Sequence, residues 1–592
     1  MTPETWLTLV LLISMSIALI KEWFPSEITI FSVVLVMLLS GIITVEEAFH
    51  GFSNPGLISI GLLFVVAGAI YNTGILHQIS HKLFGDHNQT LFRALMRIVF
   101  PVAGISAFMN NTPVVAIMIP AIRAWAEKHD LAPSRFLIPI SFAAILGGMT
   151  TLIGTSTNLI VHGLMMEFGL PGLSLFEITP VGVPVALVGL IFLVLVGGKL
   201  LPERKQPMVE LGKNTREFVI ALRVTEEYAY LGKTIEQAGL RHLKGLFLFQ
   251  IERQGQVITP APPDEVIRSG DRLFFTGLPK TILELQKTPG LVLTRDASFD
   301  LKQYDNTRIK AYEAVVSPGS PLIGKNVRES NFRQKYDAVI IAIHRHGERI
   351  QQKIGDIVLR PGDTLLLLAD RDFRNRYYHS NDFYLVSPSD DIPSRPRWQA
   401  YVSVAIFLGM LVLTVGNIFP LVVSALLAVV LVLLSGILRP VEARATVDFR
   451  VLTTIAGAFA ISEGIRNSGL AQLLASGIIE IGHYGGSIGI VGMLFLVTSL
   501  YTTVITSNAT AALLFPVAYS VAQSTGLDPH ALGIAVAIAA AGSFATPISY
   551  QTNMMVYGPG GYRFADFLRI GIPLQLLTGV AAILVIYLVY LR

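Results

Sequence analysis

Long apolar stretches dominate both ends of the chain, whereas the segment from about 202 to 397 is polar. A helix crosses the hydrocarbon core of a bilayer with about 20 apolar residues. Stretches of that kind occur five times on each side of the polar segment, and we predict spans over residues 5–21, 27–43, 56–73, 135–162, 178–200, 398–415, 418–438, 449–466, 530–557 and 567–590. The pattern therefore predicts a polytopic α-helical membrane protein with a soluble α+β insert.

Two further apolar stretches, 90–124 and 487–523, turn at a polar tip near their midpoint. The tips are Asn110-Asn111-Thr112 and Ser507-Asn508-Ala509. We predict that each stretch is a re-entrant hairpin, because irregular backbone at membrane depth is tolerated where it lies against protein or a water-filled cavity. The alternative is a pair of ordinary spans in each stretch.

Charged loop residues are segregated in this topology. One side holds, among others, Arg93, Arg97, Arg123, Lys128, Arg135, Lys199, Arg439, Arg444, Arg450, Arg563 and Arg569. The opposite loops hold Glu46, Glu47, Glu167, Glu177 and Asp528, with Arg466 and Arg592 as the basic residues there. By the positive-inside rule, we expect a cytoplasmic insert, both termini outside, and a place in the plasma (inner) membrane. The first span has no positive n-region and no small-residue cleavage site, so we expect it to be retained rather than cleaved as a signal peptide.

The two membrane halves, 1–202 and 398–592, repeat one another. Three matches share the offset 395: Leu38–Ile42 with Leu433–Ile437, Asn72–Gly74 with Asn467–Gly469, and Thr157–Gly163 with Thr552–Gly558. Because the first half is predicted to cross the membrane five times, an odd number, the second copy would be upside down. Inverted repeats with interrupted helices are typical of secondary transporters, which bind substrate near the midplane where the repeats meet.

Two predicted spans contain a run of small polar side chains in their middle, Thr150–Asn158 and Ala545–Asn553. Gly154 and Pro547 lie in these runs, at points where a helix would open. The N–H groups and positive dipole end of a broken helix suit an anion, and the opened carbonyl and amide oxygens suit a hard cation such as sodium. The alternative is that these side chains only hold helices together.

Composition excludes several classes of function. The chain has no cysteine, which removes disulfides, thiolate metal sites and cysteine nucleophiles. A net charge of +4 is too small to indicate a nucleic-acid partner, and mean hydropathy is +0.59. The sequence contains no recognisable nucleophile–base pair or metal-binding cluster, so we expect neither an enzyme nor a cofactor. The pair Glu463 and Arg466 lies one helical turn apart in a predicted span, which favours an ion pair near the outer surface over a proton relay.

With these tips and breaks, both membrane halves resemble the divalent anion:sodium symporter family, the sodium-coupled sulfate and dicarboxylate carriers. Family tips carry Ser-Asn-Thr and family breaks carry Thr-Pro-Pro-Asn-like turns. Here Asn110 replaces the serine, Ala509 a threonine, and Ser156-Thr157 the two prolines. The run Gln551–Tyr562 and the insert resemble the sulfate-permease-like branch, and the missing hydroxyl at Ala509 weakens the expectation of dicarboxylate binding.

The resemblance implies site residues, elevator-type alternating access and a homodimer. One implied sodium site consists of Ser106, Asn110, Asn111 and Gly154, and the other of Thr503, Thr506, Asn508 and Ala545. Implied substrate contacts are Asn111, Thr112, Thr155, Ser156, Ser507, Asn508 and Thr546.

The insert contains a second, smaller repeat with the offset 92. Leu231–Lys233 matches Ile323–Lys325, and Arg268–Leu273 matches Arg360–Leu365. Each unit alternates short β-rich runs with Gly-Asp turns and one short helix. The units, 215–290 and 308–385, resemble tandem TrkA-C domains, which implies either a ligand-sensing or dimerising module that gates the transporter or a domain that only stabilises the dimer.

The leading hypothesis is a carrier that imports a small dianion, sulfate foremost, with sodium. A dicarboxylate:sodium symporter, a cation/proton antiporter of the same superfamily and a regulated channel remain as alternatives. The antiporter predicts an essential membrane carboxylate such as Glu463, and the channel predicts conductance without saturation or coupling.

Overall fold

The structure is a computed structural model of the 592-residue chain. It describes all residues except 1, 22, 76–90, 130, 204–218, 241–245, 255, 259–260, 278–287, 294–308, 318–319, 346–347, 351, 353, 371, 378–381 and 386–395. The domain boundaries that the sequence predicts, at 202–215, 290–308 and 385–398, lie largely outside the described residues.

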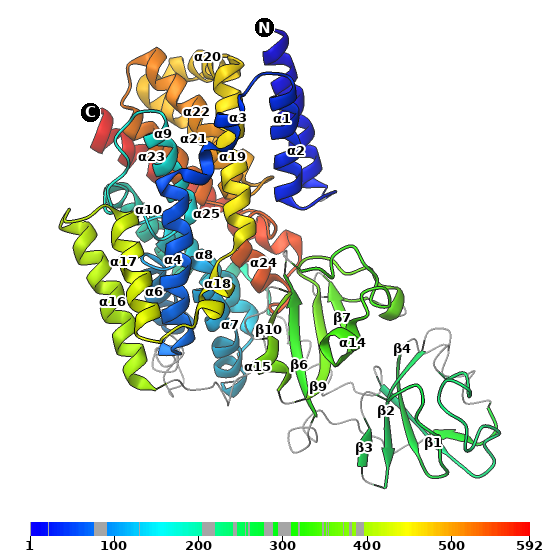
Figure 1. Ribbon diagram of the computed structural model, residues 1–592. Coiled ribbons are helices and arrows are strands. Elements are labelled where there is room, and N and C mark those ends of the chain that lie inside the picture. The colour runs from blue at the N-terminus through cyan, green and yellow to red at the C-terminus, as the bar shows by residue number, and fades with distance from the viewer. Residues whose placement is uncertain are drawn as a thin grey trace.

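Helices form both ends of the chain (Figure 1). The first half contains α1 (Pro3–Ile20), α2 (Ser26–Leu39), α3 (Val45–His50), α4 (Pro55–Asn72), α6 (Leu91–Ser106), α7 (Asn111–Lys128), α8 (Leu137–Gly148), α9 (Ser156–Glu167), α10 (Thr179–Phe192) and α11 (Gly198–Leu200). The second half contains α16 (Arg397–Val415), α17 (Leu421–Leu434), α18 (Pro440–Thr446), α19 (Phe449–Asn467), α20 (Leu470–Gly482), α21 (Gly486–Thr502), α22 (Ser507–Thr525), α23 (Pro529–Ala541), α24 (Gln551–Tyr557) and α25 (Phe564–Ile586). Helices of the two halves are interleaved, with α17 beside α4 and α19 beside α2 (Figure 1).

Helix bounds in the second half follow those in the first at nearly constant spacing. Both bounds of α17 lie 395 residues after those of α2, and α21 and α24 each begin 395 residues after α6 and α9. Local caps support the same starts: the Asn54 side chain accepts a hydrogen bond from Gly56 N before α4, and Asp448 accepts from Arg450 N before α19. The repeated sequence motifs thus accompany repeated helices.

Six helical segments among the described residues are long and apolar enough to cross a membrane, or seven if the pair α18 and α19, bent by 54°, is one span. The sequence predicts ten spans, and five of them overlap these helical segments. The sixth segment, Leu470–Thr502, overlaps the predicted hairpin 487–523 instead, and the predicted span 449–466 lies in the bent pair. The other four predicted spans are not long continuous helices, for two reasons. Helices α2 and α17 have 14 residues each, about 21 Å at 1.5 Å per residue. The predicted spans 135–162 and 530–557 are each interrupted, by the segments 149–155 and 542–550, so neither is a continuous helix.

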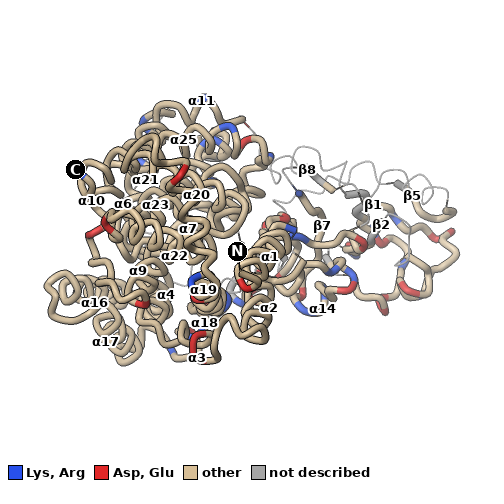
Figure 2. The backbone as a smooth tube through the Cα atoms, turned by 90° about the horizontal axis from the view of Figure 1, so that it is seen from above, with Lys and Arg blue, Asp and Glu red and all other residues tan. Residues whose placement is uncertain are grey.

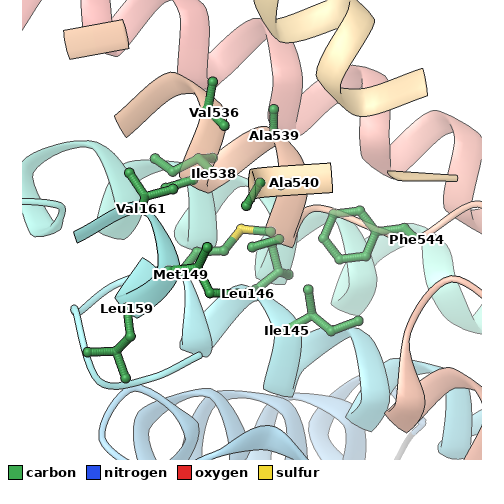
Figure 3. Close-up of a cluster of buried hydrophobic side chains, with 14 of the residues drawn as sticks. Ile145, Leu146, Met149, Leu159, Val161, Val536, Ile538, Ala539, Ala540 and Phe544 are labelled. Atoms are coloured by element: carbon green, nitrogen blue, oxygen red, sulfur yellow. The ribbon is translucent and has the colours of Figure 1, made fainter. Parts of the chain in front are cut away.

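An apolar core packs behind these two interruptions. Helices α8, α9 and α23 meet there through buried side chains, among them Leu146, Met149, Val161 and Ile538, with Phe544 beside them (Figure 3). Met149 and Phe544 belong to the two interrupting segments themselves, and each is 1% exposed or less. Met149 and Phe544 therefore anchor the two interruptions in the core, whereas Ile548 of the second interruption is 44% exposed.

The insert forms two five-stranded antiparallel sheets. The first contains β1 (Val219–Val224), β2 (Leu246–Arg253), β3 (Gln256–Ile258), β4 (Arg272–Gly277) and β5 (Leu291–Leu293), in the order β3-β2-β4-β1-β5. The second contains β6 (Ile309–Val316), β7 (Ala338–Arg345), β8 (Glu348–Arg349), β9 (Thr364–Asp370) and β10 (Phe383–Leu385), in the order β10-β6-β9-β7-β8, with the short helices α14 (Phe332–Tyr336) and α15 (Phe373–Tyr377). We call these sheets, with their loops, the first and second modules.

The two modules share one topology in matching register. Ala221 pairs with Phe274 in the first, and Glu313 pairs with Leu366 in the second, where Leu366 follows Phe274 by 92 residues. An arginine of one strand is paired with the aspartate of the Gly-Asp turn in each module: Arg253 with Asp271 at 2.8 Å, and Arg345 with Asp363 at 2.7 Å. Charged residues are frequent in the insert and sparse along most membrane helices (Figure 2).

Candidate substrate and ion site

The first hairpin turns between α6 and α7, and the tip residue Asn111 is the first residue of α7. Ser106, the last residue of α6, donates a hydrogen bond through Oγ to Asn111 Oδ1 at 2.5 Å. Both side chains are fully buried. Neighbouring Asn110 is partly exposed, and its Oδ1 accepts a hydrogen bond from Thr112 N at 3.5 Å. Ser106 and Asn111 thus already share one hydrogen bond, with oxygens that could ligate a hard cation.

Tyr550, at the end of the second interruption, joins this hairpin to the first interruption. Asn111 Nδ2 donates to the Tyr550 hydroxyl at 2.7 Å, and Thr155 Oγ1 lies 2.9 Å from the same hydroxyl. Asn111 and Tyr550 are separated by 439 residues along the chain. The hydroxyl therefore connects three polar segments, two from the first half and one from the second.

A second pair of contacts crosses between the halves in a matching way. Ser156 Oγ, at the start of α9, donates to Asn508 Oδ1 of the second hairpin tip at 2.9 Å. Thr157 Oγ1 donates to the same oxygen at 3.3 Å. In the other direction, Thr112 Oγ1 of the first hairpin tip donates to Gln551 Oε1, at the start of α24, at 3.1 Å. Each hairpin tip thus contacts the interrupted helix of the opposite half.

Two asparagines, 395 residues apart, bridge the interruptions. Asn158 Nδ2 donates to the carbonyls of Gly148 and Thr151 at 3.2 and 2.8 Å, and Asn553 Nδ2 donates to those of Ser543 and Thr546 at 2.9 and 3.2 Å. Carbonyls at the end of a helix lack intrahelical partners, and these amides supply partners for some of them. The buried Asn158 Oδ1 accepts no hydrogen bond among the described residues, which leaves it as an oxygen that a cation could use.

Glycine allows the close approach of the first interruption to the first hairpin. A Cβ on Gly154 would lie 2.6 Å from Gly148 O and 2.9 Å from Ala107 O. A Cβ on Gly148 would lie 2.8 Å from Asn111 Oδ1. Both distances to backbone oxygens are too short for a real carbon, so Gly154 permits the two segments to pack. Three of the four residues of the first implied sodium site, Ser106, Asn111 and Gly154, therefore lie in segments that pack against one another.

The second implied sodium site is less closely connected. Thr546 Oγ1 donates to the carbonyl of Thr503 at 3.1 Å, which joins the second interruption to the second hairpin. Ala545 is 6% exposed. Thr506 is the exposed residue just before α22, and Ser507 is buried at its first position. The contacts of Asn508 go to α9 rather than to Thr503 or Ala545.

The contacts that assemble the site use hydroxyl and amide groups only. Helices α7, α9 and α22 begin at Asn111, Ser156 and Ser507, so their N-terminal N–H groups and positive dipole ends lie at these contacts. Glu463 forms its ion pair with Arg466, one turn along α19, as the sequence predicts. Among the described residues, no group of three or more His, Cys, Asp or Glu side chains could hold a metal ion. The site thus offers neutral oxygen and N–H groups to its ligands.

A small cavity adjoins the first tip and the first interruption. Asn110 and Ser156 supply its polar lining, and Leu63 and Phe64 of α4 together with Phe407 of α16 supply part of its apolar wall. The cavity therefore lies between the polar segments of the site and the helices beside them.

The residues Tyr550 and Gln551 belong to the site by their contacts, but the resemblance did not single them out. They lie in the second polar run, where Ser549, Tyr550 and Gln551 stand at 395 residues from Gly154, Thr155 and Ser156. If 395 is added to the numbers of the implied site residues Thr155 and Ser156, the results are Tyr550 and Gln551. The repeat could therefore have identified both residues from the sequence.

Known proteins resemble this chain over most of its length. The chain matches the citrate transporter family CitMHS over residues 16–539. A protein of Chlamydomonas reinhardtii, named as a regulator of the response to sulfur deprivation, is 37% identical over 577 residues, covering 95% of this chain and 98% of that protein. An uncharacterized transporter of Synechocystis sp. is 32% identical, covering 99% and 98%. Sodium/sulfate cotransporter 1 of Chlamydomonas reinhardtii is 26% identical, covering 96% and 88%.

The match covers most of both membrane halves and the insert between them, and the relatives align over nearly the whole chain. The family and the last two of these relatives are named as transporters, not enzymes. The chain therefore belongs to the citrate transporter family CitMHS, a family of the divalent anion:sodium symporter type.

Proposed function

We propose that the protein is a secondary active transporter that imports a small divalent anion, sulfate foremost, together with sodium ions. The observation that carries the proposal is the pair of crossed contacts, Ser156 with Asn508 and Thr112 with Gln551. They bring uncharged donors and helix N-termini of both halves to one place, which suits an oxyanion. The relatives named as sodium/sulfate cotransporters support the choice of ions.

Sodium would be held by hydroxyl, amide and carbonyl oxygens near the first hairpin, around Ser106, Asn110, Asn111 and Gly154, and near the second, around Thr503, Thr506, Asn508 and Ala545. Coupling is needed on energetic grounds. A dianion that enters a cell at −100 mV works against about 4.6 kcal/mol, at about 2.3 kcal/mol per charge. The sequence places no Lys or Arg in the site runs to offset that charge, so bound cations must do so. More than two sodium ions per dianion would let the potential drive uptake.

The matching helix bounds support a repeat of the membrane half. The segregation of charged loop residues supports its inversion, with the insert in the cytoplasm and both termini outside. An elevator-type movement in a homodimer follows from the resemblance to sodium-coupled dianion carriers. In this arrangement the substrate would touch Asn111, Thr112, Thr155, Ser156, Ser507, Asn508 and Thr546. The two modules of the insert would be regulatory domains of the TrkA-C kind, and their repeated topology supports a common origin.

The test is sulfate uptake by purified protein in liposomes, with and without an inward sodium gradient, for wild type and Asn508→Ala. We expect saturable sodium-dependent uptake that the substitution reduces at least tenfold, because the amide contacts both Ser156 and Thr157. Thr525→Ala is the matched control, since its hydroxyl bonds the Val521 carbonyl within the same helix α22. Absence of sulfate uptake under any sodium gradient would remove sulfate as the substrate.

A dicarboxylate or tricarboxylate is the second candidate. The family is named for citrate transport, and the cavity beside Asn110 and Ser156 has an apolar wall that a carbon chain could contact. Competition of unlabelled succinate and citrate against labelled sulfate, in the same liposomes, separates the two candidates. Inhibition by succinate or citrate at concentrations below that of sulfate would favour the organic anion.

A further inference from the structure

The second module contacts the membrane helices through a buried ion pair. Arg123 Nη2 of α7 lies 2.7 Å from Glu313 Oε2 of β6, and the two side chains are 4% and 2% exposed. A buried charge without a partner is strongly destabilising, so this pair requires the module and α7 to stay together. Val315, two residues further along β6, belongs to the same apolar core as the membrane helices.

The same module also contacts α24. The turn before β9 places Gly362 against Met554 and Tyr557: a Cβ on Gly362 would lie 3.5 Å from Met554 Cγ and 3.8 Å from Tyr557 Cδ1. Gly558, directly after α24, packs against Thr364 of β9 so closely that a side chain there has no room. Figure 1 shows the second sheet beside α24 and α7, with the first sheet further from the helices.

Both of these helices, α7 and α24, also contribute residues to the candidate site. Helix α7 begins with Asn111 and Thr112, and Arg123 follows about three turns later. Helix α24 begins with Gln551, which accepts a hydrogen bond from Thr112. One helix comes from each half of the chain. The module therefore holds their far ends while their near ends form a contact of the site.

The first module lacks the feature that makes this attachment. Ala221 stands at the position of Glu313, as the matching registers Ala221–Phe274 and Glu313–Leu366 establish. A buried carboxylate in the middle of a strand is costly unless it is paired. Its presence in the module that contacts α7, and an alanine in the other, indicates that Glu313 serves the attachment rather than the fold of the sheet.

We infer that the second module is a regulatory clamp on the candidate site. It holds α7 and α24 together at their ends away from the site, and it thereby sets the position of Thr112 relative to Gln551 and the access to the cavity beside them. A ligand or partner that binds the insert acts on the site through these two helices. This inference rests on the proposed function in one respect: it assumes that the candidate site is the site that binds substrate.

The absence of cysteine in the chain provides a direct test. Ala67→Cys places a single thiol in the wall of the cavity, and its rate of reaction with a hydrophilic thiol reagent reports access in the full-length protein, without any substrate. We expect Arg123→Glu and Glu313→Arg each to raise the rate at least fivefold. The double variant with the charges exchanged should return the rate to within twofold of the parent. Hydrogen–deuterium exchange of residues 551–557 should rise and fall in parallel.

Arg328→Glu is the matched control, because it reverses a charge on the same module in an exposed pair with Asp356, and it should leave the rate unchanged. Where a charge reversal prevents folding, Glu313→Gln replaces it. Unchanged labelling and exchange in the single variants would overturn the clamp, as would an effect that the exchange of charges does not reverse. Sulfate uptake is measured separately on the same variants: a clamp effect without sulfate uptake leaves the clamp standing and removes the proposed substrate.

Discussion

Tyr550 connects more segments of the candidate site than any residue that the sequence motifs single out. Its hydroxyl accepts a hydrogen bond from Asn111 and lies within hydrogen-bond distance of Thr155. Tyr550 is itself the last residue of the second interruption. A buried hydroxyl with two partners is costly to remove, because both partners then lose a hydrogen bond. Single side chains of this kind, rather than charged residues, hold the hairpin and the two interruptions in register.

At the residue scale, we predict that Tyr550→Phe reduces kcat/KM for the transported anion about tenfold. Each lost hydrogen bond contributes about 0.5–1.5 kcal/mol, and about 1.4 kcal/mol corresponds to a factor of ten. Initial uptake rates over a range of anion and sodium concentrations measure the effect. Tyr501→Phe is the control, because its hydroxyl bonds Ser16, away from the tips and interruptions. A Tyr550→Phe variant with the kinetics of wild type would exclude the hydroxyl from the site.

The interrupted helices are the elements that make the site possible. Helix α8 ends at Gly148 and α23 at Ala541, and each helix that follows begins after seven to nine residues without helical structure. Asn158 and Asn553 bridge the two gaps by the same pair of carbonyl contacts, and Met149 and Phe544 anchor them in the apolar core. The backbone opens because side chains replace the missing helical hydrogen bonds, not because the chain is apolar or flexible there.

At the element scale, Gly154→Ala should separate the first interruption from the first hairpin. The added methyl group would lie 2.6 Å from Gly148 O and 2.9 Å from Ala107 O, and overpacking of this kind costs about 1–3 kcal/mol. We expect a lower midpoint of thermal unfolding in detergent and a loss of uptake. Gly104→Ala, in α6 of the same hairpin with no atom within 4 Å of the added carbon, should be neutral or slightly stabilising. Equal behaviour of the two variants would contradict this role of Gly154.

Across the whole molecule, charge is kept away from the site and gathered elsewhere. Glu463 and Arg466 pair along α19, His50 lies 3.3 Å from Glu167, and His530 lies 2.8 Å from Glu177. The last two pairs join segments more than 100 residues apart. These charged groups link helices to one another and take no part in the neutral contacts that form the candidate site. The ion pairs therefore have a structural role in this arrangement.

At the scale of the molecule, we predict that Glu463→Gln retains sodium-driven uptake within about twofold. The amide still accepts a hydrogen bond, and Arg466, with a side chain 42% exposed, can reach water. Uptake driven separately by a sodium gradient and by a proton gradient, in wild type and variant liposomes, measures this. Loss of all uptake in Glu463→Gln, together with proton-driven uptake in wild type, would instead favour the proton-coupled alternative.

The membrane character, the hairpin tips and the internal sequence repeats could be predicted from the sequence. Hydropathy and the spacing of matching motifs can both be read along the chain without knowledge of its packing. The sequence placed the first residues of α7 and α22 within the tips Asn110–Thr112 and Ser507–Ala509, and it located both interruptions. The ten predicted spans exceed the number of long continuous apolar helices, because 135–162 and 530–557 are broken at the predicted polar runs and α2 and α17 have only 14 residues each.

The contacts between the polar segments depend on tertiary packing and could not be predicted from the sequence. Asn111 and Tyr550 lie 439 residues apart, and Ser156 and Asn508 lie 352 apart, so no local pattern could pair them. The resemblance suggested that each tip works with the interruption of its own half, whereas the hydrogen bonds also join each tip to the opposite half. The buried pair of Arg123 and Glu313 is of the same kind: each residue reads as an ordinary charge in its own segment, and its role arises from the packing of one segment on another.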